Sequence, residues 1–512
     1  MFVRTYAGAV VGIDAVAVTV EVNIAGGGLG MYLVGLPDNA VKESEQRIRA
    51  AFENSGERMS GKKVVVSLAP ADLRKEGSGF DLPFAVGILA AMGCIDAEAV
   101  AGTMFVGELS LDGSLKPVRG VLPVAIRARS EGLRRVVLPV ENAAEAAVVD
   151  GIGVIGVTTL REVVGYLNGE MQIAPAVPAA DEPFDAAATR YAEDFADVRG
   201  QAHVKRALEI AAAGGHNVIM IGAPGSGKTM LARRMTGILP ELSVEDQQEA
   251  LCIHSVLGEN IDGLLAGHRP FRSPHHSIST AGLIGGGRPV HPGEISLAHG
   301  GVLFLDELAE FPTGVLQTLR QPIERGYVRI VRVDGAFTFP SRFQLLAASN
   351  PCPCGFLGDR EVPCRCSAAM VERYRSKLRG PLADRIDMMI DVTRPDPQVI
   401  IEGAEGMSSA ELRDYVVRGR AFRAWRESRM DDADAEAEDD ESRSIDGVVS
   451  TFALDEAAEK CVLGLSKRTH LTGRGIVRLV RIARTIADVA ESERVTQDHV
   501  LEAAMYQGRR DQ

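Results

Sequence analysis

The sequence has few aromatic residues, few cysteines and no long apolar run. Of its 512 residues, 5% are aromatic, one is tryptophan and seven are cysteine. No apolar run approaches the roughly 18 residues that cross a bilayer, and Asp14 interrupts the apolar N-terminus, which argues against a secretion signal. Seven cysteines, four of them close together, do not suggest a disulfide framework. We expect a cytoplasmic protein that does not cross a membrane.

The sequence also lacks an excess of positive charge. Lys and Arg number 56 against 69 Asp and Glu, a net charge of −13, so any contact with DNA must be local. Eight of the acidic residues stand in residues 431–441, DDADAEAEDDE, which we interpret as a solvated loop between helices. A hydrophobic content of 46% and a length of 512 residues predict roughly three folded domains.

Strand and helix patterns divide the chain into three parts. Residues 1–168 have the pattern of a mixed α/β domain, with a helix over Asn39–Asn54 that begins at a capping-type Asn. The strand candidates of this domain are Ala15–Val22, Val64–Leu68, Met104–Gly107 and Val136–Leu138. Residues 169–189, rich in alanine, proline and acidic residues, are the predicted linker to the rest of the chain.

Residues 190–395 have the pattern of an open α/β sheet, and residues 396–512 that of a helical lid. Three short apolar runs predict buried parallel strands at Val218–Ile221, Val302–Leu305 and Phe343–Ala348. Past Asp391 the apolar spacing becomes helical. One apolar stripe of the lid consists of Ile476, Leu479, Val480, Ala483, Ile486 and Ala487.

A phosphate-binding loop follows the first of these strands. The sequence GAPGSGKT satisfies G-x-x-x-x-G-K-[ST] at every position and opens into a helical stretch. Its residues are Gly222, Ala223, Pro224, Gly225, Ser226, Gly227, Lys228 and Thr229. In such a loop the backbone N–H groups approach phosphate oxygens, Lys228 reaches the β- and γ-phosphates, and the Thr229 hydroxyl holds Mg²⁺. The motif predicts binding of ATP with Mg²⁺.

Two carboxylates follow the second strand. Asp306 and Glu307 stand at the carboxyl end of GVLFL, where open sheets bind ligands. We expect Asp306 to complete the Mg²⁺ shell and Glu307 to orient and deprotonate the attacking water, which together predict hydrolysis. Asn350 ends the third strand and could contact the γ-phosphate or the water, although Asn before Pro351 is also a common turn initiator.

These motifs resemble those of the magnesium-chelatase-like AAA+ ATPases, most closely the ComM/YifB group. The resemblance rests on GAPGSGKTMLARR, GEISLAHGGVLFLDELAEF, LLAASNPCPCG and GPLADRID, and on VGLPDNAVKES and APADLRKEGSGFDLPFAVGILAA near the N-terminus. It implies that Asn350 is sensor 1, that Arg385 is an arginine finger acting on the neighbouring subunit, and that Arg474 is the sensor 2 arginine of the lid. It also implies a homo-oligomer, because an arginine finger that acts in trans requires a neighbouring subunit. Since AAA+ relatives form hexameric rings, the implied oligomer is a hexameric ring.

The resemblance implies a first domain with the fold of the Lon protease domain but without its catalytic dyad. Gly79 stands where the nucleophilic serine is expected, with Ser78 one place early, and Leu122 or Pro123 stands where the lysine is expected. A nucleophile without its base is weak. We therefore interpret this domain as structural or ring-organising.

Four cysteines, Cys352, Cys354, Cys364 and Cys366, form two C-x-C pairs nine residues apart. Four thiolates around one ion make a closed zinc site. Because C-x-C is less common than C-x-x-C at such sites, the spacing leaves zinc and free thiols beside the nucleotide loop evenly balanced.

Two further segments carry basic residues. The loop RPFRSPHHS contains Arg269, Arg272, His275 and His276. Adjacent residues of an extended chain face opposite ways, so we expect this loop to contact an anionic partner rather than to bind a metal. The sequence GYVRIVRVDGAF predicts a hairpin bearing Arg329 and Arg332. In related ATPases such a hairpin lines the ring pore, where arginines could grip nucleic-acid phosphates; a solvated edge hairpin is the alternative.

The sequence thus predicts an ATP-hydrolysing ring motor. The resemblance suggests branched or single-stranded DNA as its substrate and branch migration in recombination or natural transformation as its activity. Two alternatives remain open, a magnesium chelatase motor subunit and an ATP-dependent protein remodeller.

Overall fold

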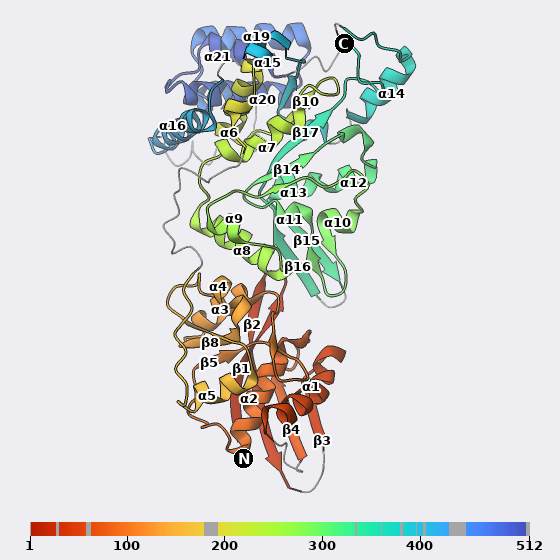
Figure 1. The fold of residues 1–512 in the computed structure, drawn as a ribbon. Coiled ribbons are helices and arrows are strands. Elements are labelled where there is room, and N and C mark those ends of the chain that lie inside the picture. Colours follow the sequence, from red (N-terminus) through yellow and green to blue (C-terminus); the bar gives the residue numbers. More distant parts are fainter. Residues whose placement is uncertain are drawn as a thin grey trace.

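In a computed structural model, the chain forms an elongated molecule. The N-terminal domain lies at one end and the helical C-terminal region at the other (Figure 1). The structure describes residues 2–26, 30–57, 63–178, 193–332, 335–359, 361–378, 382–395, 397–402, 406–429 and 447–507. Within these ranges no helix has the length and apolarity needed to cross a membrane. The acidic residues 431–441 and linker residues 179–189 lie outside the described residues.

The N-terminal domain is built on a seven-stranded mixed sheet of order β3-β4-β2-β1-β5-β8-β9. Its strands are β1 (Phe2–Val11), β2 (Asp14–Ala25), β3 (Gly30–Val34), β4 (Lys63–Ala69), β5 (Thr103–Phe105), β8 (Arg135–Pro139) and β9 (Gly153–Val157), and β6 (Glu108–Leu109) pairs separately with β7 (Leu115–Lys116). The helices are α1 (Asn39–Ser55), α2 (Asp81–Met92), α3 (Val121–Ser130), α4 (Val140–Ala146) and α5 (Leu160–Leu167). All four predicted strands and the predicted helix are confirmed, but Asp38, not Asn39, caps α1, through its carboxylate and the N–H of Val41.

Alternation along β2 gives the N-terminal sheet two apolar faces. Val18, Val20 and Val22 belong to one core with α2, whereas Ala15 belongs to a second core with α3 and α4. The second core does not end with the domain, because Leu251 and Leu264 of the following domain are buried in it. Helix α8 (Val244–Leu257) thus packs on α3, and the N–H of Gly120 donates to the carbonyl of Ser255 at 3.0 Å.

The central domain contains a five-stranded sheet of order β11-β14-β17-β10-β18, in which every pair is parallel. Its strands are β11 (Phe271–Arg272), β14 (Val302–Leu305), β17 (Gln344–Ser349), β10 (Val218–Ile221) and β18 (Met388–Asp391). The helices of this domain, besides α8, are α6 (Ala202–Gly214), α7 (Lys228–Ile238), α9 (Asp262–Leu265), α10 (Thr280–Ile284), α11 (Glu294–Leu297), α12 (Thr313–Thr318), α13 (Arg320–Arg325) and α14 (Ala368–Leu378). The three predicted buried strands form the centre of this sheet, and the predicted open α/β fold is confirmed.

Two hairpins leave the central domain on the side of the N-terminal domain. The strands β15 (Tyr327–Arg332) and β16 (Gly335–Pro340) pair antiparallel, with Arg332 opposite Gly335, which confirms the predicted hairpin; residues 333–334 lie outside the described ranges. The short strands β12 (Gly285–Gly286) and β13 (His291–Pro292) form the other hairpin. A guanidinium nitrogen of Arg332 comes within 3.5 Å of the place a Cβ would take at Gly286, so the two hairpins touch.

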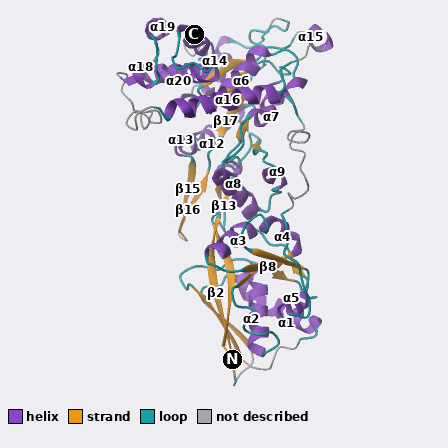
Figure 2. Ribbon diagram, turned by 90° about the vertical axis from the view of Figure 1, so that its left-hand side faces the viewer, coloured by secondary structure: helices purple, strands orange, loops and turns teal. Residues whose placement is uncertain are grey.

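The C-terminal region is helical, as predicted. Its helices are α15 (Pro397–Glu402), α16 (Ser409–Glu427), α18 (Val448–Thr451), α19 (Glu456–Thr469), α20 (Gly473–Val489) and α21 (Gln497–Met505). The predicted stripe lies on α20, where five of its six residues are buried and Ile476 is partly buried against the same core. Figure 2 shows these helices at the end of the molecule opposite to the N-terminal domain.

Candidate functional site

The phosphate loop occupies the turn between β10 and α7. Gly225 and Gly227 have φ values of +78° and +91°, which side chains other than glycine rarely adopt. A Cβ at Gly222 would lie 2.2 Å from the carbonyl oxygen of Val392, so this position must also be glycine. The Ser226 hydroxyl is buried and has no hydrogen-bond partner among the described residues. The loop therefore offers an open cradle of donors at a helix N-terminus, as an anionic phosphate requires.

Lys228 is held at the mouth of this cradle. The residue is 9% exposed, and Nζ donates to the carbonyls of Gly222 at 2.7 Å and Ala223 at 3.0 Å and to Oδ1 of Asn350 at 3.3 Å. Burial lowers the pKa of Lys228, whereas the carboxylates of Asp306 and Glu307 raise it. The ammonium group of Lys228 is thus fixed at a point where a bound phosphate would compensate for the water that burial has removed from it.

The two predicted Mg²⁺ ligands meet at one point. Thr229 is the second residue of α7, which follows β10, and Asp306 follows β14, two strands away in the sheet. The hydroxyl of Thr229 donates to Oδ2 of Asp306 at 2.7 Å. A hydroxyl and a carboxylate oxygen are ligands that suit Mg²⁺, so these residues fit the metal that a triphosphate requires.

Glu307 stands beside this pair in an unusual backbone conformation. Its φ is +51°, its ψ is +47°, and its N–H donates to Oδ1 of Asp306 at 2.9 Å. This left-handed conformation is uncommon for a residue other than glycine and often marks a functional position. The Glu307 side chain is 57% exposed, and Oε2 lies 3.5 Å from Nδ1 of His276. The carboxylate is therefore accessible to a water molecule and is contacted from one side.

The histidine loop differs from its prediction. The rings of His275 and His276 do not face opposite ways, because their centroids are 4.0 Å apart, and the backbone turns here after β11. Nδ1 of His275 lies 2.8 Å from the Ser277 hydroxyl, while His276 contacts Glu307. The two rings thus lie together, and each contacts a different side chain.

The arginines of this loop bond within the chain. Arg272 makes two hydrogen bonds to the carboxylate of Glu294, at 2.7 and 2.8 Å, and Arg269 donates to backbone carbonyls, among them that of Pro240. The anionic partner predicted for this loop is thus, for Arg272, a carboxylate of the protein itself. These bonds fix the position of the segment that contains His276, the residue in contact with Glu307.

Arg385 lies at the amino ends of the parallel strands, whereas the phosphate loop lies at their carboxyl ends. Its backbone carbonyl accepts a hydrogen bond from Asn217, the residue before β10, at 3.0 Å. The phosphate loop begins at the other end of this four-residue strand, roughly 13 Å away at 3.3 Å per residue. The Arg385 guanidinium is buried and paired with Glu324. Within one chain, Arg385 is therefore remote from the nucleotide cradle.

Arg474 lies on α20, and the next turn of this helix contacts the residue before Arg385. Arg474 is exposed in the first turn of α20. In the next turn Arg478 donates to the carbonyl of Asp384 at 2.8 Å, and further along the helix the Thr485 hydroxyl lies 2.8 Å from Nε2 of His216. Helix α20 thus follows the amino ends of the parallel strands. The structure brings Lys228, Thr229, Asp306, Glu307 and Asn350 together, and it places Arg385 and the helix that carries Arg474 at the amino ends of the strands.

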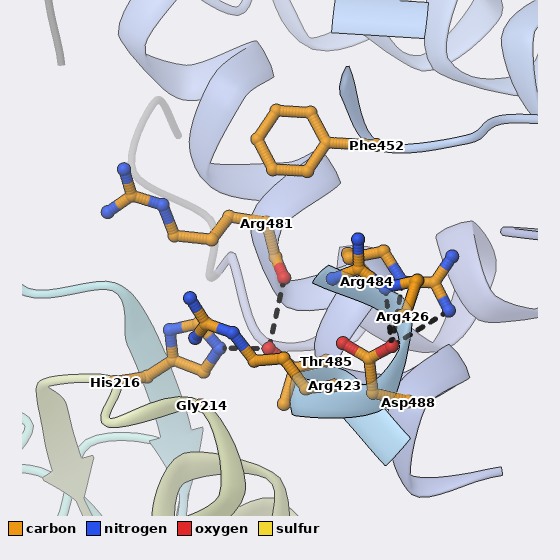
Figure 3. A pocket seen from close by; sticks show the side chains of 9 residues that line it. All are labelled: Gly214, His216, Arg423, Arg426, Phe452, Arg481, Arg484, Thr485 and Asp488. Carbon is orange, nitrogen blue, oxygen red and sulfur yellow. Dashed lines mark hydrogen bonds and ion pairs between the residues drawn. The ribbon is translucent and has the colours of Figure 1, made fainter. Parts of the chain in front are cut away.

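An arginine-lined pocket lies between α16, α20 and the segment that follows α6 (Figure 3). The pocket is lined by Gly214, His216, Arg423, Arg426, Phe452, Arg481, Arg484, Thr485 and Asp488. Arg426 and Arg484 both bond to Oδ1 of Asp488, at 3.2 and 3.1 Å, and all three side chains are buried. This network joins α16 to α20 and holds the helical region together. It lies at the amino edge of the sheet and takes no part in the nucleotide cradle.

The four cysteines converge, although they come from two separate C-x-C pairs. The Sγ atom of Cys352 lies 3.4 Å from that of Cys354 and 3.7 Å from that of Cys364, and all four sulfurs lie within 4.8 Å of one another. Four sulfurs about 2.3 Å from a tetrahedral zinc would be about 3.8 Å apart. The cluster therefore has the size of a zinc site, and Cys352 is fully buried in it.

A second cluster of metal-ligating groups is already neutralised by the protein. Asp246, Glu249 and His299 lie within ligand distance of one another, but Arg342 donates to Asp246 at 2.6 Å and to Glu249 at 2.8 Å. A cation bound there would have to displace this guanidinium.

The N-terminal serine has an acidic partner. The hydroxyl of Ser78 donates to the carboxylate of Glu108. Leu122 and Pro123, which replace the expected lysine, are buried in α3. A carboxylate beside this hydroxyl is not the lysine base that a Lon-type dyad uses.

Two features of the site were not predicted from the sequence. One is the contact of His276 with Glu307, and the other is the position of the cysteine cluster against the phosphate loop, where Gly355 faces Pro224. Each joins segments more than 30 residues apart, and neither has a local motif. In the sequence, only the His275-His276 dipeptide pointed to the first contact, and only the glycine between the cysteine pairs, Gly355, pointed to the second.

Three family models match the chain, and together they span most of it. The model described as "Magnesium chelatase, subunit ChlI" matches residues 194–400, "Subunit ChlI of Mg-chelatase" matches residues 20–142, and "Magnesium chelatase, subunit ChlI C-terminal" matches residues 406–507. A stretch of 145 residues is also 30% identical to Lon protease 2 of Bacillus subtilis, covering 28% of this chain and 24% of that protein.

Two relatives match over nearly their full length. The chain is 40% identical to competence protein ComM of Haemophilus influenzae over 503 residues, 98% of this chain and 96% of the relative. It is 39% identical to the uncharacterized protein YifB of Escherichia coli over 500 residues, 97% and 95% of the two chains. With the motifs and the geometry described above, these matches show that the chain belongs to the magnesium-chelatase-like ComM/YifB family of AAA+ proteins.

Proposed function

We propose that the chain is an ATP-hydrolysing ring motor that moves branched DNA. The observation that carries the ATPase proposal is the 2.7 Å bond between Thr229 and Asp306, because it joins the phosphate loop to the acidic strand end at the place where Mg²⁺ is needed. The loop residues 222–227 and Lys228 bind the phosphates. Thr229 and Asp306 hold Mg²⁺, which would neutralise charge on the phosphate oxygens.

Glu307 is the proposed base in this reaction. It orients the attacking water and accepts its proton, and Asn350, fixed by Lys228, contacts the γ-phosphate or the water. His276 holds the Glu307 carboxylate from the outer side. Because the Glu307 carboxylate is exposed and beside the Mg²⁺ pair, a water can be placed between Glu307 and a phosphate bound to Lys228.

A ring supplies the arginines that one chain does not bring to its own site. Arg385 and the helix that carries Arg474 lie at the amino ends of the strands, on the face remote from the cradle, and this position supports a role at the nucleotide of a neighbouring subunit. In a closed ring of six, every remote face meets a neighbour's cradle. Arg385 would have to leave Glu324 to act in this way, so ring assembly would control the finger.

The DNA proposal rests on the β15–β16 hairpin. Arg329 and Arg332 are exposed on it, although the whole chain is acidic, so they form a local site for phosphates. The glycine-rich β12–β13 hairpin touches Arg332 and belongs to the segment that carries His276. A DNA strand held by these hairpins would therefore be connected to Glu307 through the short stretch of chain that contains His276. The name of the competence relative supports a role with incoming or recombining DNA.

The decisive experiment is strand displacement on a forked or four-way DNA. We expect the unaltered chain to move the junction with ATP and Mg²⁺, and Glu307→Gln to bind ATP without moving it. Glu310→Gln is the matched control, since Glu310 is an exposed carboxylate three residues away. Arg329→Ala with Arg332→Ala should abolish DNA-stimulated ATP turnover, whereas Arg161→Ala, an exposed arginine on α5, should not. ATP turnover that ignores DNA in the unaltered chain would refute the proposal.

A magnesium chelatase motor is the second candidate, favoured by the descriptions of all three family models. Because one of these matches residues 20–142, the presence of an N-terminal domain does not separate the two candidates. DNA-stimulated turnover does, since a chelatase motor would not respond to DNA. Turnover stimulated only by an unfolded protein would instead indicate a protein remodeller.

We also assign zinc to Cys352, Cys354, Cys364 and Cys366. The sulfur separations support this assignment because they match a tetrahedral site and exceed those of a disulfide. One zinc ion per chain is expected in protein purified without chelator.

A further inference from the structure

The segment from Cys352 to Cys366, here called the cysteine loop, packs directly on the phosphate loop. Gly355 has a φ of +85°, and a Cβ at this position would lie 2.6 Å from Cδ and 2.7 Å from Cγ of Pro224. The Cγ atom of Asn350 would be 3.9 Å away. No side chain fits between the two loops, so the backbone of the cysteine loop forms part of the wall behind the phosphate loop.

A second connection runs through Arg394. Its Nη2 donates to the carbonyl of Pro224 at 3.3 Å. The same guanidinium lies 3.8 Å from the carboxylate of Asp359 and 5.6 Å from the ring centroid of Phe356, both in the cysteine loop. Arg394 therefore links the middle of the phosphate loop to the residues between the two cysteine pairs.

The third connection is the chain itself. Asn350, which accepts a hydrogen bond from Lys228, is two residues before the fully buried Cys352. The carbonyl of Cys352 accepts a hydrogen bond from the N–H of Gly355 at 2.9 Å. A metal that fixes Cys352 would thus fix both the residue that contacts Lys228 and the glycine that contacts Pro224.

We infer that zinc in the four-cysteine site braces the phosphate loop, so that zinc and ATP bind cooperatively to one chain. Three connections join the two sites, and they run through Gly355, through Arg394 and through Asn350. Without zinc, the four thiols no longer share an ion, and the cysteine loop loses the bond that closes it. Coupling between two binding sites is reciprocal, so zinc must raise the affinity for ATP by the same factor by which ATP raises the affinity for zinc. This inference rests on the proposed ATP site but not on the proposed DNA substrate.

The test compares zinc-loaded protein with protein from which a chelator has removed zinc. Zinc content is measured by mass spectrometry, and the Kd of a fluorescent ATP analogue is measured without DNA. We expect one zinc per chain and a roughly tenfold higher Kd after its removal, within the usual range of coupling between sites. Saturating ATP and Mg²⁺ should slow the release of zinc to a chelator. A zinc-free purified protein, or a Kd that is the same with and without zinc, would overturn the inference.

Two glycine variants separate bracing from general damage to the loop. Gly355→Ala introduces a methyl group against the ring of Pro224 and leaves all four cysteines in place. Gly358→Ala is its matched control, since Gly358 has a similar φ of +81° but nothing within 4 Å of its Cβ position. We expect both variants to retain zinc, and only Gly355→Ala to weaken ATP binding. In Gly355→Ala, removal of zinc should then raise the Kd by a smaller factor than in the unaltered chain, because both changes disturb the contact between Gly355 and Pro224.

The outcomes distinguish this inference from the proposed function. If junctions move but the Kd does not depend on zinc, only the bracing is wrong. If the Kd depends on zinc and Gly355 but DNA has no effect on turnover, only the DNA proposal is wrong. Normal ATP binding by Gly355→Ala would overturn the bracing even if zinc is present.

Discussion

Replacing Lys228 by methionine should remove the stabilisation by ATP without destabilising the nucleotide-free protein. Methionine has a similar length but no charge. In the structure, burial lowers the pKa of Lys228 below its unfolded value despite the nearby Asp306 and Glu307. A cation with a lowered pKa costs stability at neutral pH, because the unfolded chain holds the proton more tightly. Removing the charge should therefore offset the loss of the bonds to Gly222 and Ala223.

The expected size follows from linkage. ATP at 100 times its Kd stabilises the folded state by about 2.7 kcal/mol, and each kcal/mol raises the Tm of a domain of this size by about 2–4 °C. The unaltered protein should therefore melt roughly 5–10 °C higher with ATP and Mg²⁺, measured by differential scanning fluorimetry. Lys228→Met should show no such rise and a nucleotide-free Tm within about 3 °C of the unaltered protein.

Arg233→Met is the control for this substitution. Arg233 lies on the same helix with a side chain that is 59% exposed, so it should keep the full rise with ATP. A Lys228→Met protein whose Tm still rises by about 5 °C or more with ATP, the lower end of the rise expected for the unaltered protein, would refute the placement of the phosphates on this loop. A nucleotide-free Tm far below that of the unaltered protein would refute the argument from the buried charge.

Three further predictions concern the other groups of the site. Arg385→Ala and Glu307→Gln proteins should each be inactive alone. When they are mixed one to one before ring assembly, about a quarter of the ATPase activity should return, because a quarter of random interfaces have both groups intact. No recovery would show that Arg385 does not act in trans. His276→Ala should lower kcat roughly tenfold with little change in KM for ATP, since His276 contacts Glu307 and not the phosphate loop, and His276→Gln should restore part of it; an effect confined to KM would contradict this role. Burial lowers the pKa of the fully buried His216 to about 4 from 6.5, so the stability it contributes is present above pH 6.5 and is lost as the pH falls toward 4. Between pH 7 and 5 this loss is about 2 kcal/mol, and denaturant titrations should show a smaller loss in His216→Gln; equal losses would contradict the assignment.

Much of the candidate nucleotide site could be predicted because its parts are local motifs at strand ends. The phosphate loop, Asp306 and Asn350 each follow a short apolar run, and parallel strands bring such ends to one edge of the sheet. Strands β11 and β18 were missed, since one has two residues and the other, Met388–Asp391, ends in a charge. The ring and the DNA substrate rest on resemblance and stay predictions.

The contacts that escaped prediction depend on how loops fold back. The two histidines were expected on opposite sides because an extended chain was assumed, but the chain turns there and the rings lie together. Arg385 and Arg272 were expected to serve partners, yet within this chain they are paired with Glu324 and Glu294. Such pairings join residues 22 and 61 positions apart, and no periodicity in the sequence encodes them.

The shared core between α3 and α8 has a consequence for dissecting the protein. Leu251 and Leu264 are buried against the N-terminal domain, so cutting the chain at the linker would expose them to water. Exposing each leucine would cost about 1.5–3 kcal/mol of folding free energy and would leave an apolar, aggregation-prone patch on the isolated central and C-terminal fragment. The N-terminal domain therefore shares part of its core with the central domain, and a truncated protein that precipitates would say nothing about what the N-terminal domain does.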